Sequence, residues 1–102
     1  MRVRVLVQAE EEAEEAARWY EERKEGLGIE FLDSLAQALE AIEENPQQFP
    51  RLETLRTRKN IRRCLLKRFP FAIIFQIRPT ESLVLAVAHV RRRPNYWKKR
   101  AR

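Results

Sequence analysis

The spacing of apolar residues changes along the chain from a strand period to a helix period and back, and this change restricts the possible folds more than any other feature. Residues 3–7 place valine at every second position, which is typical of a strand with one buried face. Residues 9–20 repeat small or apolar residues every three or four positions, which predicts a helix. Because its stripe is mostly alanine, another segment can approach it closely. Gly26-Leu27-Gly28 ends this helix, since glycine tolerates the left-handed conformation.

A second helix and three strands come next. Apolar residues at spacings of three and four predict the helix over 31–42, and Asn45-Pro46 ends it because proline cannot continue the hydrogen-bond ladder. Three runs rich in β-forming residues predict consecutive, antiparallel strands over 61–66, 71–77 and 83–90. The fold class is therefore α+β, in the order β-α-α-β-β-β, with a helical hairpin on a small, mainly antiparallel sheet. At 102 residues we expect one domain, 1–102, with a basic tail over 93–102.

The two halves of the chain carry opposite charge. Up to Pro50 there are five basic and thirteen acidic residues, a net charge of −8, whereas from Arg51 onward sixteen basic and two acidic residues give +14. This asymmetry indicates a surface for nucleic acid or for an acidic protein in the second half. Acidic helices lying over a basic sheet are the alternative explanation for part of it. Within residues 46–60, four cations predict an exposed basic loop: Arg51, Arg56, Arg58 and Lys59.

Several classes of chemistry lack their usual motifs. The chain has no Walker loop, no dinucleotide-binding glycine pattern and no Gly-x-Ser-x-Gly sequence. Cys64 and His89 are the single cysteine and histidine, so we expect no disulfide and no metal site. A chain of this size has little room for an enclosed cavity, so we also expect no cofactor. A lone cysteine suggests a reducing, cytoplasmic setting. The longest apolar run, 69–75, is far shorter than the roughly 20 residues of a membrane span, so we expect no membrane contact.

His89 is the side chain best suited to acid–base chemistry near neutral pH. His89 follows Leu83, Leu85 and Val87 at every second position, so in a regular strand it shares their face. This indicates a histidine at the edge of the core with a local hydrogen bond. The alternative is a general base in RNA cleavage, with cations and an acid supplied by Arg68, Arg92 and Tyr96.

The basic tail combines cations with Tyr96 and Trp97, a mixture that suits phosphates and stacked bases but also protein interfaces. The alternative is that Trp97 folds back over the sheet. We interpret Trp19, Tyr20 and Phe49 as packing residues.

Short motifs in a fixed order resemble the RelE/ParE superfamily of toxins from bacterial type II toxin-antitoxin modules. They are Arg18-Trp19-Tyr20-Glu21, Gly26-Leu27-Gly28 with Phe31-Leu32, Asn45-Pro46 with Phe49-Pro50, Ile61-Arg62-Arg63, Arg68-Phe69-Pro70-Phe71, and Ala86-Val87-Ala88-His89 with Arg92, Pro94, Tyr96 and Trp97. The 68–71 motif and the region 89–97 favour the ParE branch. The chain also lacks the arrangement of lysines and terminal tyrosine found in the ribosome-dependent nucleases.

The resemblance implies a toxin that inhibits DNA gyrase through its C-terminal region and is neutralised by a cognate antitoxin in a hetero-oligomer. The alternatives are a RelE-like endoribonuclease that cleaves mRNA on the ribosome, and a non-toxic nucleic-acid-binding module. The implied target-binding residues are Arg91, Arg92, Arg93, Tyr96, Trp97 and Lys98. The expected antitoxin-binding residues are Ala13, Ala16, Ala17, Tyr20, Arg62 and Arg63. No residue is catalytic in the gyrase reading, whereas the ribonuclease reading uses His89, Arg68, Arg92 and Tyr96.

Overall fold

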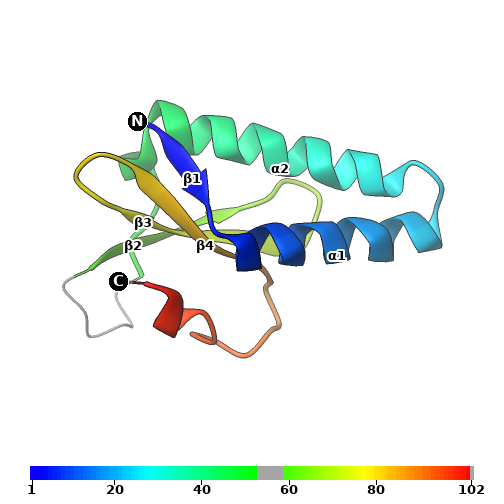
Figure 1. The fold of residues 1–102 in the computed structure, drawn as a ribbon. Helices are drawn as coiled ribbons and strands as arrows, with labels where there is room; N and C mark the ends of the chain where they lie inside the picture. The colour runs from blue at the N-terminus through cyan, green and yellow to red at the C-terminus, as the bar shows by residue number, and fades with distance from the viewer. Residues whose placement is uncertain (53–58, 102) are drawn as a thin grey trace.

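Two helices and a four-stranded sheet form the framework of the protein (Figure 1). The structure, a computed structural model, describes residues 1–52 and 59–101. Arg56 and Arg58 of the expected basic loop lie outside the described residues. The elements are β1 (Val3–Val5), α1 (Val7–Arg23), α2 (Leu27–Glu44), the short 3-10 helix η1 (Pro46–Gln48), β2 (Asn60–Leu65), β3 (Phe71–Ile77), β4 (Ser82–His89) and the 3-10 helix η2 (Lys98–Arg100).

The sheet has the order β1-β4-β3-β2. The pairs β2–β3 and β3–β4 are antiparallel, and β1 runs parallel to β4 at the edge. The predicted order and the mainly antiparallel sheet are therefore confirmed. None of the helices in the described ranges combines the length and apolar character that a membrane crossing needs.

The connection between the helices depends on two glycines with different roles. Gly26 has a φ of 88°, the left-handed conformation expected for it. Gly28 lies inside α2, where an added Cβ would come within 2.7 Å of the carbonyl oxygen of Ala17. The segment that approaches the alanine stripe of α1 is therefore the protein's own second helix. The Glu21 carboxylate accepts hydrogen bonds from the N–H groups of both glycines, which lowers the pKa of Glu21.

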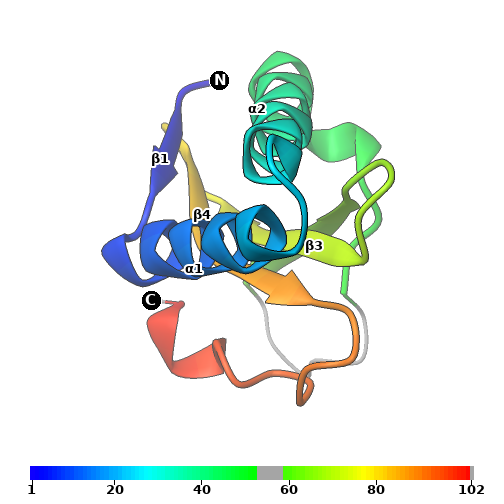
Figure 2. The ribbon, with the colours of Figure 1, turned by 90° about the vertical axis from the view of Figure 1, so that its right-hand side faces the viewer.

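Both faces of the sheet are covered. The helices and one face enclose a core cluster that includes Phe31, Ile73 and Phe75. The opposite face packs against residues from the end of the chain, and Trp97 and Ala101 are only 4% and 6% exposed. Figures 1 and 2 show this C-terminal segment, defined here as residues 90–101, on the side of the sheet away from the helices.

A β-bulge in β4 changes which side chains share a face. Ile74 pairs with Ala86 and Phe75 pairs with Val84, so Leu85 is an extra residue in the ladder. Leu83 and Leu85 belong to the cluster under the C-terminal segment, whereas Val87 belongs to the cluster under the helices. The prediction that His89 shares one face with Leu83, Leu85 and Val87 is therefore wrong, because the bulge reverses the alternation part-way along the strand.

Candidate functional site

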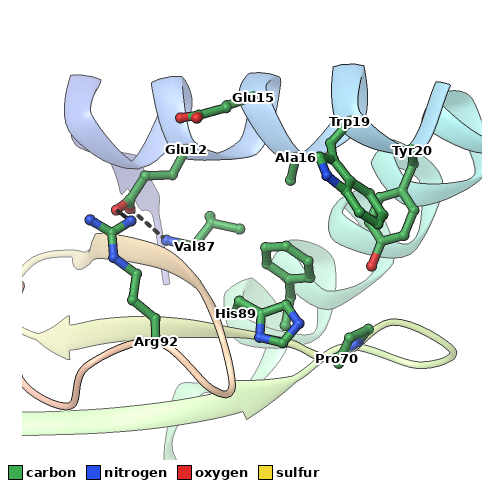
Figure 3. A pocket seen from close by; sticks show the side chains of 10 residues that line it. Glu12, Glu15, Ala16, Trp19, Tyr20, Pro70, Val87, His89 and Arg92 are labelled. Carbon is green, nitrogen blue, oxygen red and sulfur yellow. Dashed lines mark hydrogen bonds and ion pairs between the residues drawn. The ribbon is translucent and has the colours of Figure 1, made fainter. Parts of the chain in front are cut away.

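An open groove runs between α1, the start of β3 and the end of β4, with a volume of about 530 Å³. We call it the α1 groove. Helical spacing along α1 supplies one wall, and the opposite wall comes from the starts and ends of the strands and the residues that follow β4 (Figure 3). The lining residues are Glu12, Glu15, Ala16, Trp19, Tyr20, Pro70, Phe71, Val87, His89 and Arg92. One end is aromatic and the other is charged.

The aromatic end exposes a tryptophan. Trp19 is 51% exposed, its ring meets Tyr20 edge-on at 5.1 Å, and the Arg23 guanidinium lies 3.6 Å from its centroid. Tyr20, in contrast, packs among core aromatics, with Phe31 stacked at 5.4 Å. The interpretation of both as packing residues is correct for Tyr20 and wrong for Trp19. A half-exposed indole beside a groove is a feature of surfaces that bind a partner.

The charged end centres on Glu12, whose side chain is 11% exposed. The Val87 N–H donates to its carboxylate at 3.1 Å and the Tyr96 hydroxyl at 2.6 Å. Arg92 donates at 3.3 Å, and Arg100 donates through two nitrogens at 3.0 and 3.4 Å. Arg100 also donates to the Leu85 carbonyl at 2.9 Å. We call Glu12 with Arg92, Tyr96 and Arg100 the Glu12 cluster, and it fastens the C-terminal segment to α1 and β4.

Sequence reasoning missed Glu12 because it is one of five glutamates in residues 10–15. The available signal was its position three residues after Ala9 and four before Ala16, which places it at the edge of the buried stripe. Arg100 gave no signal, since nothing distinguishes it from the neighbouring cations until the fold brings it to Glu12.

Tyr96 is held in its protonated form by its surroundings. Burial, together with the hydrogen bond to Glu12, raises the pKa of Tyr96 well above its usual range. The Arg92 guanidinium stacks 3.8 Å from the centroid of the Tyr96 ring. The phenol is therefore a hydrogen-bond donor within the cluster and is poorly suited to releasing a proton.

His89 hydrogen-bonds locally at the edge of the core, as expected. Its Nδ1 accepts from the Arg91 N–H at 3.0 Å, and its ring meets Phe71 edge-on at 5.2 Å. Arg92 lines the same groove, whereas Arg68 lies in the β2–β3 connection, paired at 3.1 Å with Glu30 of α2. The structure therefore brings Arg92 and Tyr96 together at Glu12, places His89 in the same groove as Arg92 but against Phe71, and places Arg68 against α2.

The predicted target-binding residues divide by exposure. Arg91, Arg92, Arg93 and Lys98 are exposed, Tyr96 is half-buried, and Trp97 is buried. Trp97 folds back over the sheet, the alternative left open by the sequence.

The predicted antitoxin-binding residues also divide. Ala13, Ala16 and Ala17 are buried in the core, and of these Ala16 lines the α1 groove together with Tyr20. Arg62 donates to the carbonyls of Gln47 and Phe49, and Arg63 is exposed.

Within residues 1–52 and 59–101, no three His, Cys, Asp or Glu side chains gather as metal ligands would.

Comparisons with known proteins give a family and a fold. The model of the family described as the ParE toxin of type II toxin-antitoxin system, parDE, matches residues 3–94. A solved structure described as a chromosomal ParDE TA system from P. aeruginosa superposes with a TM-score of 0.70 at 14% sequence identity, covering 87% of this chain and 95% of that one. At that identity the likeness concerns the fold. The search of curated proteins found no match.

Proposed function

Because this chain belongs to the ParE toxin family of type II toxin-antitoxin systems, we propose that it inhibits DNA gyrase and that a cognate antitoxin neutralises it. The observation that carries the proposal is the family match over residues 3–94, which spans both helices, the whole sheet and the start of the C-terminal segment. The family implies an antitoxin partner.

The α1 groove is the proposed docking site for the antitoxin. It offers apolar surface from the half-exposed Trp19 and the half-buried Tyr20 and Phe71 in a concave shape that suits an amphipathic peptide segment. Arg92, 52% exposed at the charged end, can pair with an acidic side chain of that segment. Among the residues expected from the sequence, Ala16 and Tyr20 keep this role, while the buried Ala13 and Ala17 act by shaping the helix surface.

The C-terminal segment is the proposed gyrase-binding surface. Arg91, Arg93 and Lys98 are exposed and supply the cationic contacts. Tyr96 and Trp97 contribute differently from the expectation of stacking on the target, because one donates to Glu12 and the other is buried against the sheet. Their proposed part is to hold the segment in one conformation, which reduces the ordering cost of binding.

A supercoiling assay with purified gyrase tests this function. The wild-type chain should inhibit supercoiling, and the pair Arg91→Gln with Arg93→Gln should inhibit much less. Arg18→Gln with Lys24→Gln, which changes the net charge equally on exposed positions near α1, is the matched control and should inhibit as the wild type does.

Induction in bacteria without the antitoxin gives the cellular readout. Filamentation and a DNA-damage response with continuing translation are expected from gyrase inhibition. Rapid translation arrest with cleaved mRNA would instead support the ribonuclease alternative, and would make His89→Ala the first variant to test. Normal growth together with unimpaired supercoiling would contradict gyrase inhibition.

A further inference from the structure

A second concave surface lies at the β1 edge of the sheet, on the side of the C-terminal segment. Its volume is about 510 Å³, and we call it the basic pocket. The lining residues are Arg4, Leu6, Gln8, Arg78, Leu83, Lys99 and Arg100. Four of these seven are Arg or Lys and none is acidic. Figure 2 shows why residues so far apart in sequence meet here, since the end of the chain returns to the start of α1.

Two carboxylates partly neutralise the pocket and fix its geometry. Glu81 accepts from Arg4 at 2.8 Å and lies 3.9 Å from Arg78, while Glu12 holds Arg100. Four cations against two carboxylates leave an excess of two positive charges. Lys99 is exposed and has no ion-pair partner within residues 1–52 and 59–101. The ion pairs therefore position guanidinium groups without cancelling the field of the pocket.

The chemistry of the lining selects the kind of ligand. A peptide needs exposed apolar anchors, but Leu83 is only 3% exposed, Leu6 is half-buried against the same core cluster, and no aromatic side chain lines the pocket. Phosphate oxygens need cationic N–H donors in a fixed arrangement, and these are what the pocket provides. The tail aromatics that could have stacked on bases are engaged elsewhere, with Trp97 buried and Tyr96 bonded to Glu12.

We propose that the basic pocket binds the phosphodiester backbone of a nucleic acid without reading its base sequence. Phosphate contacts alone give sequence-independent affinity that depends steeply on salt. This binding goes beyond gyrase inhibition and antitoxin binding, because it requires neither protein.

Fluorescence anisotropy of the purified chain with labelled DNA duplexes of two unrelated sequences tests the proposal. If the excess of two positive charges neutralises about two phosphates, the logarithm of the association constant should fall with the logarithm of salt at a slope of about −1.8. The affinity should then drop about twelve-fold between about 50 and 200 mM salt, equally for both duplexes. A duplex RNA in the same assay shows whether the pocket prefers the phosphodiester backbone of DNA or that of RNA.

The matched variants separate the pocket from net charge. Arg78→Gln with Lys99→Gln removes the excess charge of the pocket, so it should bind more weakly and bring the slope close to zero. Arg18→Gln with Lys24→Gln removes the same charge outside the pocket and should leave the slope unchanged. Circular dichroism checks the fold, and the single exposed Lys99→Gln replaces the double variant if that one does not fold. Equal losses in both pairs, no binding by the wild type at about 50 mM salt, or equally tight binding of polyglutamate would overturn the proposal.

Discussion

Replacing Glu12 with alanine should both destabilise the protein and release its C-terminal segment. The Val87 N–H and the Tyr96 hydroxyl, both in partly buried surroundings, lose their acceptor, at a cost of about 1 kcal/mol each. Arg100, 20% exposed, loses its charge partner but keeps its hydrogen bond to the Leu85 carbonyl. This loss adds about 1 kcal/mol to the destabilisation. Arg92 is 52% exposed and returns to water at little cost. The free energy of unfolding should fall by about 3 kcal/mol, which lowers the melting temperature by about 12 to 24 °C.

Two measurements check this expectation. Urea denaturation gives the free energy of unfolding, and acrylamide quenching of Trp97 in a Trp19→Phe background reports whether the segment has left the sheet. Glu15→Ala is the matched control, because it removes the same charge from an exposed position of α1 and should change stability by less than about 0.5 kcal/mol. Glu12→Gln keeps one oxygen acceptor, so its free energy of unfolding should lie between those of Glu12→Ala and Glu15→Ala. If Glu12→Ala is as stable as Glu15→Ala, or if Trp97 stays shielded, then Glu12 does not hold the segment.

Single contacts elsewhere in the chain give three more expected outcomes. Gly28→Ala should lower the free energy of unfolding by about 1–3 kcal/mol, because the new Cβ would lie 2.7 Å from the Ala17 carbonyl oxygen. An unchanged midpoint of urea denaturation would contradict this close approach. Folding raises the pKa of Tyr96, so the contribution of its hydroxyl to stability should be complete below the unfolded pKa of about 10. That contribution should be lost as the pH rises through the folded pKa. Tyr96→Phe should therefore flatten the alkaline part of a plot of unfolding free energy against pH. Trp19→Ala should abolish rescue by the coexpressed antitoxin while the exposed Ile29→Ala does not, and equal rescue of both would remove Trp19 from the antitoxin site.

Local chemistry made the framework predictable. The alternation of valines, the alanine stripe and the stop at Asn45-Pro46 each depend on neighbouring residues, so the order of elements could be read directly. The left-handed Gly26 was also predictable, since few other residues adopt its φ of 88° without strain.

The candidate site depended on contacts that sequence spacing does not encode. The bulge at Leu85 places His89 on the opposite face from Leu83 and Leu85, and no local residue signals it. Glu12 and Arg100 are 88 positions apart and acquire their roles only when the C-terminal segment crosses the sheet. Composition correctly identified a basic C-terminal region, but it did not distinguish cations that hold the segment from cations that remain exposed.

The pairing of β1 with β4 also has a consequence for the order in which the chain folds. Val3 is opposite Ser82, 79 positions away, whereas the helical hairpin and the β2–β3–β4 meander form from segments close in sequence. Closing the long loop costs the most chain entropy, so β1 should dock late. Until it does, the hydrogen-bonding edge of β4 is open and can pair with a strand of another chain. The three-residue strand β1 therefore protects this edge from pairing with other chains only after it has docked, and the chain is most exposed to aggregation in the interval before that.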